Sequence, residues 1–85
     1  MDIEFDADKN DINWEKHDLS LAQFEGFDSE PMVVEDDRYD YGETRYRAFG
    51  RIGGVGHMIA FTIREGTMRL ISFRRCHEKE MKRYE

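Results

Sequence analysis

Hydrophobic and polar residues alternate along the second half of the chain, the pattern of a β-sheet with two unlike faces. Over residues 45–52, arginines such as Arg45 and Arg47 fall on one side and hydrophobic residues on the other. Residues 57–64 and 68–75 continue the alternation, and Gly53-Gly54 separates the first two segments. The pattern therefore predicts three strands joined by tight turns.

The connection between the last two predicted strands decides which side chains share a face. A three-residue loop at Glu65-Gly66-Thr67 is preferred here because it gathers the bulky hydrophobic residues on one face, namely Ile59, Phe61, Ile63, Ile71 and Phe73. The other face then carries Arg64 and Arg74 among smaller residues. A two-residue loop would shift the pairing by one residue.

The first half of the chain carries shorter elements. Ile3 and Phe5 alternate with acidic residues and predict a short strand, and Asp6 or Asp8 can cap a helix over residues 9–17 that Asp18 closes. Ser20 is a suitable cap for a second short helix that holds Leu21, Phe24 and Phe27. Residues 32–34 allow a further strand, and residues 78–84 predict a last helix.

These elements predict one α+β domain over residues 1–85. Its expected order is β-α-α-(β)-β-β-β-α, a small antiparallel sheet with two N-terminal helices and one C-terminal helix. The helices are expected to cover one face of the sheet and to leave the face with Arg64 and Arg74 open.

Composition excludes several classes of protein. The chain is 39% hydrophobic, 38% charged and 13% aromatic, too aromatic for a disordered tail and too polar for a membrane protein. The longest apolar run is 58–61, and the N-terminus carries no secretion signal, so we expect a cytoplasmic protein with no membrane partner. Cys76 is the one cysteine, which favours a packed, inert thiol over a reactive one.

Charge is sorted by position. Residues 1–43 carry fifteen Asp or Glu against three Lys or Arg, whereas residues 44–85 carry four against ten. Most arginines therefore lie on the predicted sheet, where a local positive field can gather phosphates. The acidic half either screens that field or receives a basic partner.

Several segments, in order and at matching spacing, resemble the BrnT-type toxins of bacterial type II toxin–antitoxin pairs. The matching residues are Phe5-Asp6-Ala7-Asp8-Lys9, Asn13, Lys16-His17-Asp18-Leu19-Ser20, Thr44-Arg45, Gly50, Thr62-Ile63-Arg64, Arg69-Leu70-Ile71-Ser72-Phe73-Arg74, Glu80 and Tyr84-Glu85. Thr44, Ile63 and Asp18 depart from the family pattern, which has glutamate at the first two positions and glycine at the third. Ile63 is the departure that bears on activity.

The resemblance implies a RelE-like fold and a ribonuclease that blocks translation. It also implies a cognate ribbon-helix-helix antitoxin, with two toxin copies held in the complex and with DNA contacted only through the antitoxin.

RNA cleavage without a metal needs a base for the 2′-hydroxyl proton, cations for the phosphorane and an acid for the leaving oxygen. Arginine suits the cationic role because its planar fork matches two phosphate oxygens. We therefore expect Arg64 and Arg74 to hold the phosphate, with Arg45 beside them as an RNA-binding residue. The alternative for all three is a solvated strand face.

The predicted first helix carries a polar stripe that includes Lys9 and His17. His17 titrates near neutrality and is a candidate acid or base, and Lys9 is a candidate phosphate ligand or base. The alternative is a solvated helix face. Tyr84 is a candidate RNA-binding residue or a packing anchor, and Glu80 is a candidate support for an arginine.

No metal or cofactor is predicted. The acidic segment 35–40 fails the calcium-loop pattern because Arg38 stands at an expected ligand position. Two functions are left: an endoribonuclease toxin, and a non-catalytic toxin-like module or co-repressor that binds a basic antitoxin.

Overall fold

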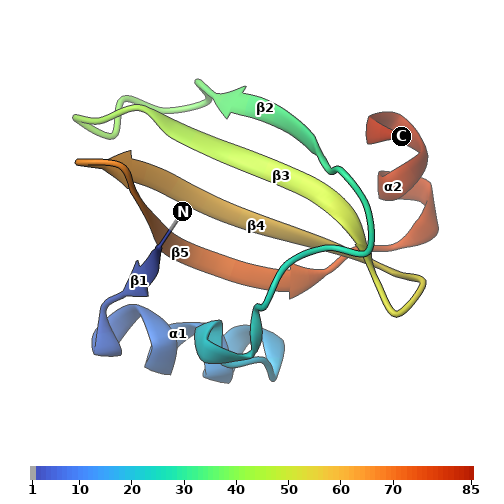
Figure 1. The fold of residues 1–85 in the computed structure, drawn as a ribbon, viewed down its shortest axis with the longest axis horizontal. Coiled ribbons are helices and arrows are strands. Elements are labelled where there is room, and N and C mark those ends of the chain that lie inside the picture. Colours follow the sequence, from blue (N-terminus) through green and yellow to red (C-terminus); the bar gives the residue numbers. More distant parts are fainter. Residues whose placement is uncertain (1) are drawn as a thin grey trace.

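A computed structural model describes residues 2–85 and shows a five-stranded sheet with one helix beside it and one at its end (Figure 1). The sheet order is β1-β5-β4-β3-β2. The elements are β1 (Ile3–Phe5), α1 (Ala7–His17), the 3₁₀ turn η1 (Leu21–Gln23), β2 (Met32–Asp36), β3 (Arg45–Ile52), β4 (Val55–Arg64), β5 (Thr67–Arg75) and α2 (Glu78–Tyr84). The α+β class is therefore confirmed.

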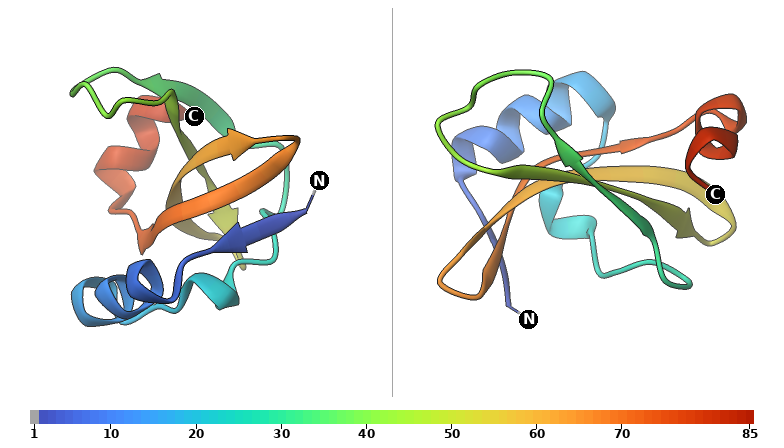
Figure 2. Two further views of the ribbon diagram at one scale, coloured as in Figure 1. Left: turned by 90° about the vertical axis from the view of Figure 1, so that its left-hand side faces the viewer. Right: turned by 90° about the horizontal axis from the view of Figure 1, so that it is seen from above.

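The sheet is mixed, so the prediction of a purely antiparallel sheet is wrong. Strands β2 to β5 form antiparallel neighbours, but β1 runs parallel to β5, with Phe5 opposite Leu70. The sheet is strongly twisted (Figure 2). Strand β1 covers only residues 68–70 of β5, so the outer edge of β5 beyond that point is left to other partners.

Two-residue turns join β3 to β4 and β4 to β5. Glu65 and Gly66 have φ angles of 52° and 79°, and Arg64 pairs directly with Thr67. The three-residue loop expected here is therefore wrong, since two consecutive positive φ angles make the compact turn that matches the strand twist.

A bulge at Ile71 changes the faces of β5 along its length. Phe61 pairs with Leu70 whereas Ala60 pairs with Ser72, so Ile71 has no opposite residue. Before the bulge, Leu70 faces the core in the place expected for Ile71, and after it Phe73 faces the core as predicted. Arg64 and Arg74 still share the opposite face.

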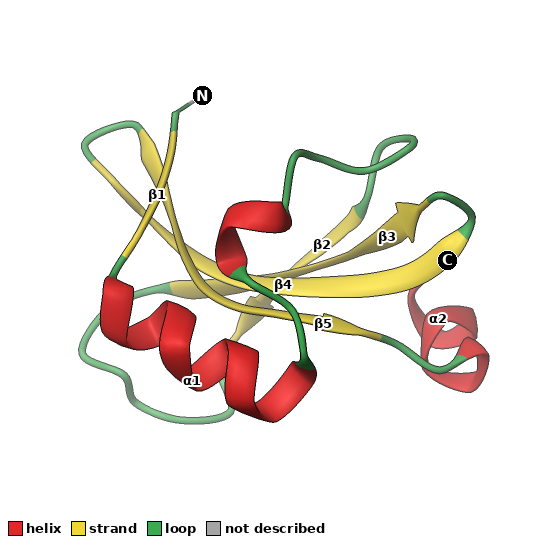
Figure 3. Ribbon diagram, turned by 90° about the horizontal axis from the view of Figure 1, so that it is seen from below, coloured by secondary structure: helices red, strands yellow, loops and turns green. Residues whose placement is uncertain are grey.

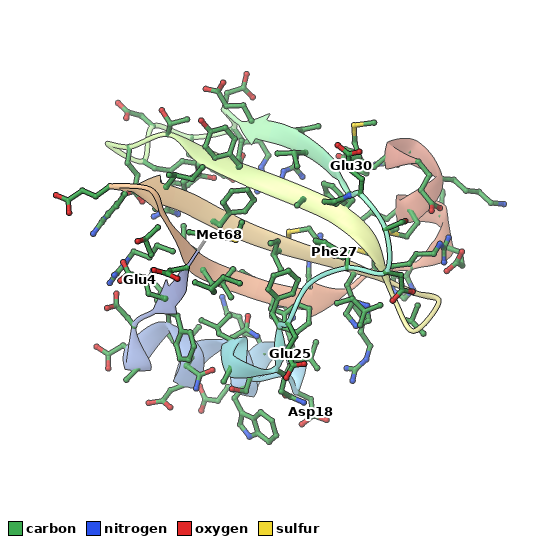
Figure 4. All side chains as sticks on the ribbon, viewed as in Figure 1. Glu4, Asp18, Glu25, Phe27, Glu30 and Met68 are labelled. Atoms are coloured by element: carbon green, nitrogen blue, oxygen red, sulfur yellow. The ribbon has the colours of Figure 1, made fainter. Side chains whose placement is uncertain are left out.

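Only one of the two expected N-terminal helices forms. Helix α1 ends at Asp18, which has a left-handed φ of 56°. The second element is the 3₁₀ turn η1, capped by Ser20 and Gln23 in a reciprocal capping box. Phe24 and Phe27 follow this turn in extended chain rather than in a helix, and they pack over the sheet through edge-on ring contacts (Phe27 is labelled in Figure 4).

The turn η1 and helix α2 lie on opposite faces of the sheet, so the prediction that the helices cover one face is wrong. The main core lies between the sheet, η1 and the following loop, and it contains Leu19, Leu21, Phe24, Ala48, Ile59, Phe61, Leu70 and Phe73. On the opposite face, α2 buries Met81 against Phe49 and Met58. Gly56 permits this contact, because a Cβ there would lie 2.3 Å from Met81 Cγ. The resemblance to the RelE fold stays a prediction.

Candidate active site

Helix α1 lies against the part of β5 that β1 leaves uncovered (Figure 3). The buried amide of Asn13 makes this contact, since it bonds the backbone of Phe73 on β5 and the carbonyl of Leu19 beyond the helix. The polar stripe of α1 is thereby fixed beside the sheet face that carries Arg74.

A pocket of about 270 Å³ lies between this stripe and β5. Its lining residues are Lys9, Ile12, Asn13, Lys16, His17, Ile71 and Ser72. Two of these side chains are cationic and none is a carboxylate, so the pocket is suited to an anion. The structure thus places Lys9 and His17 in one pocket and adds Lys16, which belongs to a matching segment but was not named as a site residue.

The pKa of His17 is lowered from its ordinary value of 6.5. Burial is the main cause, and the positive charges of Arg74 and Lys16 add to it. Arg74 is therefore close enough to act on His17 electrostatically. A histidine with a lowered pKa is neutral at pH 7 and can accept a proton.

Arg74 is held by Glu80 in a two-pronged ion pair. Its Nη1 and Nη2 atoms donate to the two carboxylate oxygens of Glu80 at 2.8 and 2.9 Å. Hydrogen bonds from Arg74 lower the pKa of Glu80 to about 2. Glu80 therefore supports an arginine, as expected. The neighbouring Cys76 is buried, and burial raises the pKa of its thiol to about 11, which indicates an inert thiol.

Arg64 and Arg45 lie at the other end of the sheet. Both donate to Glu43, at 3.0 and 3.1 Å. Met58 on β4 lies directly opposite Arg74 on β5, and Arg64 is six residues further along β4. The Cα positions of Arg64 and Arg74 are therefore about 20 Å apart. Arg45 lies beside Arg64 as expected, but the structure does not bring either of them into one pocket with Arg74.

Tyr84 packs on the same face as Arg74. Its ring stacks on that of Phe49 with centroids 3.7 Å apart and an interplanar angle of 2°. The guanidinium of Arg47 lies 5.5 Å from the Phe49 ring centre and 5.8 Å from the Tyr84 ring centre. Arg47 was placed on the arginine side of its strand by sequence alternation, but no motif marked it as a site residue.

Two further findings concern the residues that the structure describes. Within residues 2–85, no three His, Cys, Asp or Glu side chains are grouped so that they could hold a metal ion. Neither helix in this part of the chain is long and apolar enough to span a bilayer.

Comparison with protein families gives a match over most of the chain. Residues 5–80 match the family model described as the ribonuclease toxin BrnT of a type II toxin–antitoxin system. The matched range includes Lys9, His17, Arg74 and Glu80 and ends before Tyr84. No curated protein matches the chain significantly.

Proposed function

The chain belongs to the BrnT family of ribonuclease toxins of type II toxin–antitoxin systems, and from this we propose that it is a metal-independent endoribonuclease that cuts transcripts and so inhibits translation. The observation that carries the proposal is the pocket between α1 and β5, which Lys9, Lys16 and His17 line and where the charge of Arg74 acts on His17. A base, a transition-state cation and phosphate ligands are the groups that such cleavage needs.

The proposed reaction is an in-line attack of a ribose 2′-oxygen on the adjacent phosphorus. His17, neutral at pH 7, takes the 2′-hydroxyl proton as the new P–O bond forms. Arg74 stabilises the added charge on the phosphorane. The P–O5′ bond then breaks, and the leaving 5′-oxygen receives a proton from Lys9. The products are a 2′,3′-cyclic phosphate and a 5′-hydroxyl.

Lys9 and His17 are eight residues apart, or about 12 Å along the helix axis. Both side chains line one pocket, and the proposal places one phosphate group between them. Lys16, next to His17 in the chain, adds positive charge to the same pocket. This arrangement supports Lys9 as acid or phosphate ligand rather than as the base.

Arg64, Arg45 and Tyr84 are proposed to bind RNA outside the reacting centre. An extended single strand that crosses the sheet face from Arg74 toward Arg64 would meet both basic positions. Glu43 pairs with Arg45 and Arg64 in the free protein, and phosphate would have to replace it. Tyr84 offers a ring for base stacking beside Arg74.

A cognate antitoxin follows from the family, and we propose that it is a basic ribbon-helix-helix protein that covers the arginine face. Its dimeric DNA-binding domain would hold two toxin copies, so that DNA is contacted only indirectly. The site of action would be the cytoplasm, where transcripts are translated.

The test uses antitoxin-free protein, an RNA substrate and EDTA. Cut ends are expected to carry 2′,3′-cyclic phosphate, and Arg74→Ala is expected to lower the rate by about 100-fold. Arg75→Ala is the control, because Arg75 is exposed and lies on the opposite face of β5. Cleavage that survives Arg74→Ala, or that EDTA abolishes, contradicts the proposal.

Two observations favour a second function, a non-catalytic toxin-like module or co-repressor. Arg45, Arg64 and Arg74 are each paired with a carboxylate in this structure, and Ile63 replaces a glutamate of the family pattern. A folded sample that neither cuts RNA nor arrests growth on expression, but still binds a basic antitoxin, would support this alternative.

A further inference from the structure

Arg47 lies on the same sheet face as Arg74, but it has no anionic partner. Its neighbours in the cross-strand row are Ala60 on β4 and, one strand further, Ser72 on β5, two residues before Arg74. Within residues 2–85, the other arginines whose side chains point to this face have carboxylate partners; these are Arg45, Arg51, Arg64, Arg69 and Arg74. No ion pair or side-chain hydrogen bond of Arg47 occurs among these residues.

The guanidinium of Arg47 is also partly cut off from water. Its Nε atom is buried and has no hydrogen-bond partner among the described residues. A buried charged donor without an acceptor costs free energy, and folded proteins rarely keep one without a compensating role. The stacked Phe49 and Tyr84 rings beside Arg47 offer attraction to a cation but no hydrogen-bond acceptor in the ring plane.

Glu80 does not fill this gap, because it makes no hydrogen bond or ion pair with Arg47 among the described residues. Glu80 lies close enough to Arg47 for the guanidinium charge to lower its pKa, yet both of its oxygens already accept hydrogen bonds from Arg74. Two guanidinium groups therefore share one carboxylate. The cluster formed by Arg47, Arg74 and Glu80 carries one uncompensated positive charge.

We infer that Arg47 is a second phosphate ligand of the RNA site and acts together with Arg74. Strands β3 and β5 are separated by β4 alone, so the Cα rows of Arg47 and Arg74 are about 10 Å apart, a span that two arginine side chains can bridge around one phosphate. A phosphodiester would accept from Arg47 and supply the missing negative charge. This inference rests on the proposed function, because it names a ligand of the same site.

If Arg47 is a phosphate ligand, one substitution of it should weaken RNA binding without lowering the stability of the fold. Replacing a half-buried, unpartnered charge by an apolar side chain of similar length should leave the folded state as stable or make it more stable. The same replacement should remove a phosphate contact. A structural role for Arg47 predicts the opposite outcome for stability.

The experiment compares Arg47→Met and Arg47→Lys with the unaltered protein, with Arg75→Met as the control. Binding is measured by fluorescence anisotropy of a 2′-O-methyl oligoribonucleotide, which cannot be cut, over a series of salt concentrations. Stability is measured by urea unfolding, and cleavage with an unmodified RNA. Arg47→Met is expected to keep the urea midpoint or raise it, to weaken binding by about tenfold or more, and to reduce the salt slope by about 0.7. Arg47→Lys should bind at an intermediate level.

Two results would overturn the inference. One is unchanged oligonucleotide affinity in Arg47→Met, and the other is a lowered urea midpoint that Arg47→Lys restores without any change in affinity. If the unaltered protein binds the oligonucleotide but does not cut unmodified RNA, the nuclease proposal fails, while the binding comparison still decides the role of Arg47.

Discussion

Asn13 hydrogen-bonds both backbone groups of Phe73, as a neighbouring strand would. Its Nδ2 donates to the Phe73 carbonyl at 2.8 Å, and the Phe73 N–H donates to Asn13 Oδ1 at 2.8 Å. Nδ2 also donates to the carbonyl of Leu19 at 2.8 Å. One side chain thus completes the edge of β5 where β1 ends, and it fixes the helix that carries Lys9 and His17.

The first prediction concerns this amide. Asn13 is 2% exposed, so Asn13→Ala leaves buried N–H and C=O groups without partners and is expected to lower the free energy of unfolding by about 2–4 kcal/mol. Asn13→Asp should cost more, because a carboxylate would face two carbonyl oxygens. Urea unfolding measures both. Glu15→Ala, at an exposed position on the same helix, should change stability by less than about 0.5 kcal/mol, and equal losses in the two alanine variants would contradict the argument.

A second prediction follows from the ion pair between Arg74 and Glu80. The pKa of Glu80 falls from 4.5 to about 2 in the folded protein. The carboxylate therefore contributes stability above pH 4.5 that is lost as the pH falls toward 2. After allowance for solvent screening this contribution is about 1 kcal/mol. Glu80→Gln should remove it, so the loss of stability between pH 4.5 and 2 should be smaller in the variant.

Unfolding by urea at a series of pH values gives this comparison. Glu78→Gln is a useful contrast, because Glu78 pairs with Arg51 at the surface and its side chain is 64% exposed. If the free energy of unfolding falls between pH 4.5 and 2 by the same amount in Glu80→Gln as in the unaltered protein, the ion pair does not contribute to stability.

The third prediction concerns protonation of His17. Burial is the larger cause of its lowered pKa and Arg74 the next. Arg74→Gln should therefore raise the pKa of His17 without restoring 6.5, whereas Arg75→Gln should leave it unchanged. NMR titration of the imidazole signals, assigned with His17→Gln, measures this without need of activity. If His17 is the base, cleavage by the unaltered protein should rise with pH to a plateau, with a midpoint below 6.5.

Sequence patterns predicted most strands of this fold because alternation along residues 45–52, 57–64 and 68–75 is a strong local signal. The hairpin register was harder. Glu65-Gly66 is a weak turn signal, and the bulge at Ile71 lets both Leu70 and Phe73 reach the core although they are three residues apart. A strict alternation rule cannot represent that irregularity.

The candidate site was predictable only in part for a related reason. Helical spacing placed Lys9 and His17 on one stripe, and strand alternation placed Arg64 and Arg74 on one face, and the structure agrees with both. Arg64 and Arg74 nevertheless lie far apart along that face. Alternation predicts which face a side chain is on, but not how far along the sheet it lies. No sequence motif marked Arg47 as a site residue. It stands out only because its guanidinium has no carboxylate partner among the described residues, and a sequence pattern does not show which side chains pair.

A fourth prediction concerns close packing at Gly50. A Cβ at this position would lie 2.6 Å from Cδ1 and 2.8 Å from Cγ of the Phe27 ring. Gly50→Ala should therefore displace Phe27 and cost about 1–3 kcal/mol in urea unfolding. Phe27→Leu in the same chain should recover part of that loss. Additive effects of the two substitutions would show that the contact is not the cause.

The last prediction separates the two ends of the arginine face. Arg64 is 57% exposed and bonds Glu43, so Arg64→Ala should weaken RNA binding and reduce its salt slope by about 0.7 while kcat is retained. Arg74→Ala should instead lower kcat. Glu43→Gln removes the carboxylate that occupies Arg45 and Arg64 in the free protein, and it should tighten RNA binding. If the antitoxin covers the same surface, calorimetry should also show weaker antitoxin binding to Arg64→Ala, and unchanged affinity would place the antitoxin elsewhere. A large loss of kcat in Arg64→Ala, with kcat kept in Arg74→Ala, would move the reacting centre to the other end of the sheet.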